Sequence, residues 1–313
     1  MLRAGHNRDS DRDCQVRAGR QPSDHGGTAT RTCRCRGDCS VSLADRHVTS
    51  SALAGRPAPV PVVLVHYHVY KNAGSSVDRA IREAVGTDSF MELDKDRGFR
   101  RAPAFNAALV RQILHGHPGI RGFTSHTFIP TVHRCNDFVA LPIVFLRHPL
   151  LRLASVFRFE AISAAHKDTP SGKLAQSAAF PEWLDAYLGM HNGKNYQTCV
   201  LSMMEDGSHS PFTNGHPRHI GDIRVAAERL DEVNSLTGVG IVEQFDRSAR
   251  RIEAAVGRHF PGFRLSGAAA NQTKQVDSWQ DELAALERSL PADLLARAVM
   301  ANASDYALYD RYR

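Results

Sequence analysis

The stretch from Val62 to Ile81 constrains the fold of this 313-residue chain more than any other segment. It begins with the apolar run VVLVHYHV, which is typical of a strand buried on both faces of a parallel sheet. A short turn follows, and an amphipathic helix is predicted from about Ser75 to Val85, with an apolar face at 3,4 spacing. A strand, a tight turn and a helix in this order predict one unit of an α/β fold.

The turn of this unit carries residues suited to an anion. Gly74 lets the backbone approach a ligand closely, and Ser75 and Ser76 are good N-cap types. The first N–H groups of a helix attract negative charge, and Lys71 adds a full positive charge beside them. The turn is therefore interpreted as a phosphate- or sulfate-binding loop. It is not a Walker A loop, because the lysine precedes the glycine. The alternative is a plain strand-to-helix turn with an incidental lysine.

A second unit of the same kind follows later in the chain. Residues 140–146 (ALPIVFL) predict a buried strand, and a helix is expected to begin at Pro149, a residue favoured in the first helical turn. Arg147 lies between them, and Ser155 follows two turns into the helix. A guanidinium fork and a hydroxyl can hold a second phosphate. The alternative is that these residues only cap the helix and bind no ligand.

Outside these units the chain alternates helices with one short strand. Helices are expected at 105–114, 180–188, 199–204, 223–234, 245–260 and in two pieces over 281–309 split at Pro291, with a strand at 239–242 and loops at 86–101 and 205–221. This alternation predicts an α/β fold with a central parallel sheet and ligands at the carboxyl ends of its strands.

The N-terminal segment has a different composition. Residues 1–58 are rich in Arg, Gly and Ser and lack aromatic residues, so disorder is predicted there and one domain at 59–313. Residues 1–60 carry ten Arg and six Asp, which leaves the remainder only mildly basic and argues against nucleic-acid binding. The run CRCRGDC matches no standard zinc spacing. No secretory signal or membrane span is evident, so a cytoplasmic protein is expected.

With both anion units in place, the sequence resembles the PAPS-dependent sulfotransferases. The resemblance is to their carbohydrate branch, which includes the heparan sulfate 2-O and 6-O enzymes and bacterial relatives. Residues 68–76 (HVYKNAGSS) are similar to the family's HIPKTAGTS loop, and residues 146–155 (LRHPLLRLAS) to its LRDPVERLLS segment. Weaker similarities lie at 195–198, 239–246 and 305–309. The motifs span residues 62–310 in the family's order.

The resemblance implies a P-loop NTPase-like three-layer fold and 3′-phosphoadenosine 5′-phosphosulfate (PAPS) as co-substrate. The sulfuryl group would pass to an acceptor hydroxyl, expected to be on a glycan, and this chemistry calls for no metal. The donor would be held by a set of loop, strand-end and connector residues: Lys71, Asn72, Ala73, Gly74, Ser75, Ser76, Arg147, Ser155 and Lys274.

Two kinds of catalytic residue are expected. Lys71 would neutralise the charge that grows on the leaving phosphate, and a histidine would take the acceptor's proton, because its pKa suits that role. His126 is the first choice, since the family has a histidine at the end of the corresponding strand. His68, His66 and His117 compete with it, and His68 is retained as a catalytic candidate that also belongs to the loop motif.

The sequence departs from the family pattern at four positions. Tyr70 replaces Pro, Asn72 replaces Thr, His148 replaces Asp or Asn, and Phe157 replaces a frequent Tyr. None of these changes removes a lysine, glycine, arginine or serine that would touch phosphate. Two rival classes stay open: a P-loop kinase or other nucleotide-binding enzyme, disfavoured by the missing GK[ST], and a non-catalytic anion-binding relative.

Overall fold

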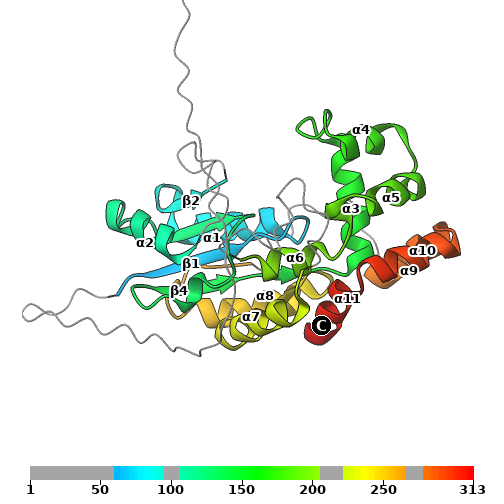
Figure 1. Ribbon diagram of the computed structural model, residues 1–313. Helices are drawn as coiled ribbons and strands as arrows, with labels where there is room; N and C mark the ends of the chain where they lie inside the picture. The colour runs from blue at the N-terminus through cyan, green and yellow to red at the C-terminus, as the bar shows by residue number, and fades with distance from the viewer. Residues whose placement is uncertain (1–59, 95–105, 205–220, 266–277) are drawn as a thin grey trace, which may run out of the picture. The chain divides into compact units, whose positions relative to one another are not determined.

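A computed structural model describes residues 60–94, 106–204, 221–265 and 278–313 (Figure 1). The segment 1–58 and Lys274, about which the sequence makes predictions, lie outside these ranges, as does most of the predicted 205–221 loop.

The centre of the fold is a parallel sheet in the order β2-β3-β1-β4. Its strands are β1 (Val62–Tyr67), β2 (Phe90–Glu92), β3 (Gly122–Ser125) and β4 (Val139–Ile143). Strand β1 is an inner strand of the sheet, with Leu64 paired to Gly122 of β3 on one side and to Leu141 of β4 on the other. Beyond Val144, β5 (Phe145–Leu146) pairs in parallel with β6 (Gly240–Ile241). The sequence therefore predicts an α/β fold with a parallel sheet correctly.

Helices cover both faces of this sheet (Figure 1). In chain order they are α1 (Gly74–Val85), α2 (Ala107–Gly116), α3 (Pro149–Ile162), α4 (Pro170–Ser177), α5 (Phe180–Leu188), α6 (Tyr196–Ser202), α7 (Ile223–Leu236), α8 (Phe245–Val256), α9 (Trp279–Ser289), α10 (Ala292–Ala301) and α11 (Ala303–Tyr312).

The alternation of β1 decides which helices pack on which face. Val63, Val65 and Tyr67 join a buried cluster with apolar residues of α2 and α7. Leu64 points the other way and packs with α1 and α8. A third apolar cluster joins α3, α5 and α10, around the fully buried Trp183.

Three local expectations differ from the structure. The predicted strand 140–146 is interrupted at Val144, because β4 pairs with β1 whereas β5 pairs with β6. The predicted loop after α1 contains β2, whose three residues are too few to show a strand pattern. The C-terminal region has three helices, since the chain also breaks at Asn302, whose Nδ2 donates to Gly193 O and Ala298 O.

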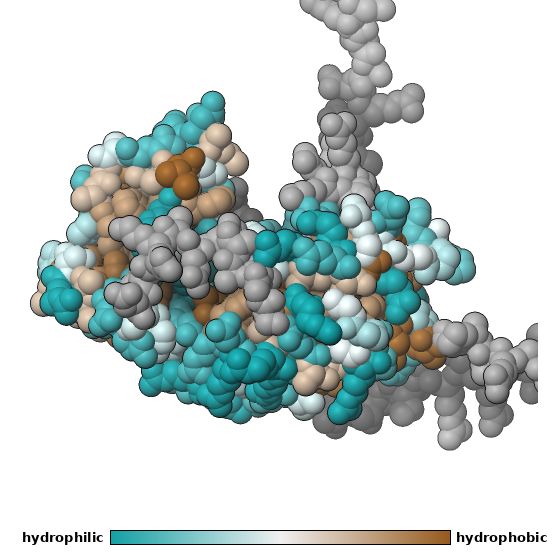
Figure 2. All heavy atoms as spheres, turned by 180° about the vertical axis from the view of Figure 1, so that it is seen from behind, coloured by the Kyte–Doolittle hydropathy of each residue, from teal (hydrophilic) through white to brown (hydrophobic). Residues whose placement is uncertain are grey.

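The rear surface is mostly hydrophilic, and apolar side chains are more frequent over one end of it (Figure 2). Ile162, the last residue of α3, is 79% exposed. Within the described ranges, every helix is too short or too polar to cross a bilayer.

Candidate functional site

The turn between β1 and α1 has an unusual backbone. Lys71 and Ala73 adopt left-handed conformations, with φ of 67° and 63°, which non-glycine residues rarely do. Ala73 is the N-cap of α1, so the helix begins at Gly74, one residue before the predicted Ser75. These conformations turn the chain sharply and aim the start of α1 at the carboxyl end of the sheet.

This turn leaves three backbone donors open. Asn72 N–H donates to Val69 O (3.1 Å), and Ser76 N–H donates to Ala73 O (3.0 Å). The N–H groups of residues 73–75 find no acceptor among the described residues. Of residues 72–76, which the sequence resemblance assigns to donor binding, residues 73–75 therefore offer open N–H groups, at the positive end of α1.

Gly74 is required by the packing of this turn. A Cβ built on Gly74 would lie 1.7 Å from Nε2 of His68, so any side chain would displace the imidazole. His68 therefore closes one side of the loop, and its Nε2 lies against the first residue of α1.

The Lys71 ammonium lies over the Phe159 ring of α3, 4.0 Å from the ring centroid. Among the described residues it has no carboxylate within 4 Å. Burial, reinforced by the positive charges of Arg147 and Arg158, lowers the pKa of Lys71 to about 8. The loop thus presents a cation that still carries its proton at neutral pH and that is available to an anion.

Arg147 connects the second unit to the first. Its Nη1 donates to Lys71 O (3.0 Å), and its Nε lies 3.8 Å from a carboxylate oxygen of Glu243. Burial lowers the pKa of Arg147, with Glu243 opposing the shift. The structure therefore brings Lys71 and Arg147 together, as the sequence predicts for two anion units that serve one ligand.

Gln197 joins the same two segments through its side-chain amide. Its Oε1 accepts from Asn72 Nδ2 (2.6 Å) and from Arg147 N–H (2.9 Å), while its Nε2 donates to Arg147 O (2.9 Å). Asn72 Nδ2 also donates to Phe145 O. Gln197 is fully buried, and each of its hydrogen bonds fixes one segment relative to the other.

The weaker motifs join this network. Buried Asp305 accepts from the N–H groups of Gln197 and Thr198 and from Thr198 Oγ1. His148 N–H donates to Glu243 (3.1 Å). The five similar segments, which lie far apart in the sequence, thus form one hydrogen-bonded cluster at the carboxyl ends of β1 and β5.

His126 lies beside the loop, just after β3. Its N–H donates to Asp94 Oδ2 (2.7 Å), and its ring packs on the ring of His68 with centroids 3.9 Å apart. Nδ1 lies 2.8 Å from His68 O. Because a carbonyl only accepts, Nδ1 carries the proton and Nε2 keeps its lone pair. Burial, followed by the neighbouring His68, lowers the pKa of His126 to about 4, so the ring is neutral at pH 7.

His66 and His68 share one carboxylate, that of Asp78 on α1. His66 Nδ1 lies 2.6 Å from Asp78 Oδ1, and His68 Nδ1 lies 3.2 Å from Asp78 Oδ2. These atoms could also be considered as metal ligands. Ligands around a zinc ion stand roughly 3.4 Å apart, given bond lengths of about 2.1 Å in a tetrahedron. A separation of 2.6 Å is instead that of a direct hydrogen bond.

Two predicted residues in the described ranges form no hydrogen bond or ion pair with the cluster, and a third lies outside those ranges. Ser155 lies in the second turn of α3, half-buried, and no hydrogen bond joins it to Arg147 or to another described residue. His117 is exposed at the end of α2. Lys274 lies outside the described residues.

Sequence reasoning missed several neighbours of the site. Asp94 follows the unrecognised β2, and it accepts from Ser125 Oγ as well as from His126 N–H. Asp78 could have been suspected from its position one turn after Gly74 on α1. Arg158, which pairs with Glu282 at 2.7 Å, lies one turn after Ser155 on α3.

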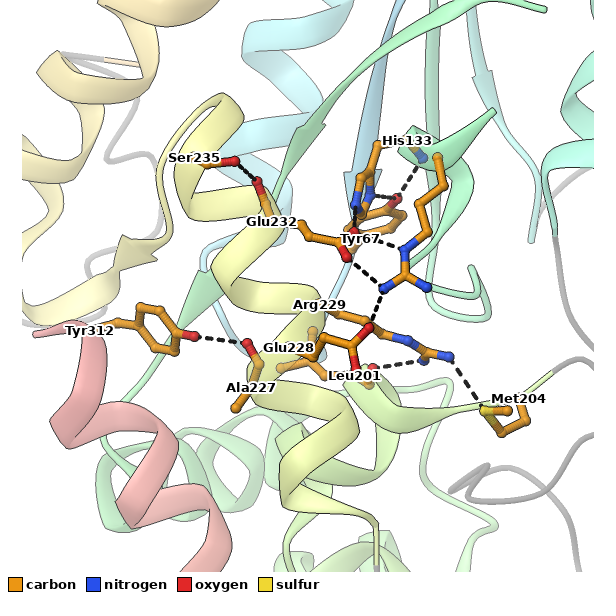
Figure 3. A network of polar contacts seen from close by, with 11 residues as sticks. Tyr67, His133, Leu201, Met204, Ala227, Glu228, Arg229, Glu232, Ser235 and Tyr312 are labelled. Carbon is orange, nitrogen blue, oxygen red and sulfur yellow. Dashed lines mark hydrogen bonds and ion pairs between the residues drawn. The ribbon is translucent and has the colours of Figure 1, made fainter. Parts of the chain in front are cut away.

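The opposite face of β1 is anchored as well. Tyr67 donates to His133 Nδ1 (2.9 Å), and His133 Nε2 donates to Glu232 of α7 (2.9 Å), as Figure 3 shows. Arg134 binds the same carboxylate. The end of β1, from which the loop starts, is therefore held by polar contacts on both faces.

Comparisons with known proteins add one distant relative. An uncharacterized protein of Archaeoglobus fulgidus is 24% identical over 259 residues, which cover 80% of this chain and 95% of that protein. No family model matches the chain, and no solved structure matches it.

Proposed function

We propose that this protein is a PAPS-dependent sulfotransferase that transfers a sulfuryl group to an acceptor hydroxyl, with a glycan as the expected acceptor class. The observation that carries the proposal is the hydrogen bond from Arg147 Nη1 to Lys71 O, together with the Gln197 cross-link. Two cation-bearing strand-to-helix turns are thereby joined into one site. A donor with phosphate groups at two positions requires such a pair.

The residues present fit an anionic donor. Within the described ranges, three open N–H groups at the start of α1, an ammonium with no carboxylate within 4 Å and a half-buried guanidinium all favour negative charge. The sheet order, with the loop directly after its central strand, is compatible with the P-loop NTPase-like fold that the sequence resemblance implies. Ser155 and Lys274 are proposed as further contacts to the donor on the basis of the sequence resemblance.

The reaction then follows from the positions of three side chains. The acceptor oxygen forms a bond to sulfur as the bond from sulfur to the phosphate oxygen breaks. Lys71 stabilises the charge that appears on that oxygen, and Nε2 of neutral His126 accepts the hydroxyl proton. His68 closes the loop beside them and supports the His126 ring.

Donor binding tests this function most directly. In calorimetry, the desulfated bisphosphate product PAP is expected to bind at least about tenfold more tightly than ATP, because a good charge-assisted contact is worth about 1.5–3 kcal/mol, which is roughly a ten- to hundredfold change in affinity. Radiolabelled PAPS should transfer sulfate to members of a sugar and alcohol panel. Equal binding of ATP and PAP would favour the kinase class, and PAP binding without any transfer would favour a non-catalytic relative.

A further inference from the structure

Asp78 stands out among the buried carboxylates because both of its oxygens are contacted by histidines, His66 near the end of β1 and His68 just after that strand. Asp78 lies on α1, so the two contacts join the end of β1 to this helix. His66 is 1% exposed and also lies 3.1 Å from Thr124 Oγ1. A carboxylate only accepts, so each of these contacts to Asp78 favours a proton on Nδ1 of the ring.

The direction of the His68 ring follows from this contact. His68 Nδ1 faces Asp78, so His68 Nε2 points to Gly74 at the start of α1. A Cβ on Gly74 would lie 1.7 Å from this Nε2. The His126 ring packs on the same His68 ring, and the His68 carbonyl accepts a hydrogen bond from His126 Nδ1. The imidazole of His68 therefore lies between Asp78 and His126, which is the proposed base.

We propose that Asp78 is a positioning residue, whose two oxygens fix His66 and His68 as Nδ1–H tautomers and thereby hold the loop and the His126 ring in their working geometry. Its kinetic consequence rests on the proposed sulfuryl transfer, whereas its effect on the tautomers does not. The titratable groups that face His68 are His66 on β1, Asp78 on α1, Asp94 after β2 and His126 after β3.

Asp78→Asn tests the proposal with little change in shape. An amide offers one acceptor and one donor, so it can accept from only one of the two rings. The other ring must then turn its Nδ1 into an acceptor and move its proton to Nε2. Such a loss of the working tautomer is how an aspartate-to-asparagine change disables catalytic histidines in triad enzymes.

The first measurement is ¹⁵N NMR of the histidine rings at pH 7, assigned with His66→Gln and His68→Gln. We expect Nδ1–H for both residues in the wild-type protein and a switch to Nε2–H in at least one of them in Asp78→Asn. Asp88→Asn, an exposed change of identical charge, should leave all ring signals in place. Unchanged tautomers in Asp78→Asn overturn the proposal, whatever the activity.

The second measurement is sulfate transfer. Asp78→Asn should lower kcat by about 10- to 100-fold, the size of effect seen when an outer residue that orients a histidine is removed. The KM for the donor should stay within about twofold of wild type, since the cations are untouched. The acid limb of kcat/KM should move to lower pH, because a negative charge near His126 is lost.

An unchanged kcat, or an equal fall in Asp88→Asn, would overturn the positioning role. A wild-type protein that transfers no sulfate refutes the proposed function and leaves the NMR measurement to decide.

Discussion

The two strand-to-helix turns of the site share a plan but do different work. The β1–α1 turn uses its backbone: Lys71 and Ala73 are left-handed, and the N–H groups of residues 73–75 have no acceptor in the described part of the chain. The β5–α3 turn starts its helix with Pro149, which has no N–H, and both backbone groups of Arg147 are bound by Gln197. The first turn, called the cradle below, offers N–H groups to an anion. Gln197, called the brace below, ties the second turn to the first. Similar sequence plans thus do not imply similar binding modes.

Lys71→Ala tests the cradle, with the largest expected effect. Removing the ammonium should lower sulfate transfer by about 10²- to 10³-fold, as loss of a charge-stabilising donor does. Arg147→Ala should instead weaken donor binding by about 10- to 100-fold with a smaller change in kcat, measured by PAP calorimetry and initial rates. If Lys71→Ala retained wild-type turnover, the cradle would have no catalytic role.

Gly74→Ala tests whether the cradle depends on His68. The added methyl group would overlap the imidazole, so we expect transfer to fall about 100-fold, within the range that a displaced catalytic group costs. Gly116→Ala, at the end of α2, is a steric control because nothing lies within 4 Å of its Cβ. Neither Gly74 nor Gly116 has a positive φ, so neither change strains the backbone. Comparable rates in the two variants would argue against the role assigned to His68.

Gln197→Met tests the brace. The apolar side chain has a similar size but leaves the N–H and C=O of Arg147 buried and unpaired, each at a cost of about 1–3 kcal/mol. We therefore expect urea unfolding to show a loss of about 2–5 kcal/mol, with weaker PAP binding. Gln176→Met, on the exposed side of α4, should change neither quantity. Unaltered stability in Gln197→Met would show that the brace contributes little.

The pH dependence of transfer gives a smaller, graded test. Lys71 must carry its proton, so kcat/KM should fall as pH rises through about 8. His126 must lack its proton, so kcat/KM should fall as pH drops toward about 4. A broad plateau between these limits is expected in rates measured from pH 4 to pH 10. A basic limb near the ordinary lysine pKa would show that Lys71 is not buried beside Arg147 and Arg158.

The contrast between the turns also explains what the sequence could predict. Strand, turn and helix are local patterns, so β1, α1 and the start of α3 at Pro149 follow from the residues themselves. Asp94 could not be predicted, because it reaches His126 through the pairing of the three-residue β2 with β3. Gln197 belongs to a similar segment, but its bonds span 50 to 125 residues of sequence. The sequence pattern predicts a shared phosphate site for Ser155 and Arg147, but no hydrogen bond joins these two side chains.

The left-handed residues of the loop have a thermodynamic consequence. A non-glycine residue in this conformation costs roughly 1–2 kcal/mol, which the folding of the surrounding strand and helix must offset. Because the loop already holds the shape in which its N–H groups converge, a ligand would not have to order it. Anion binding should therefore show a small entropic penalty, and Ala73→Gly should raise the stability of the free protein while making the binding entropy less favourable.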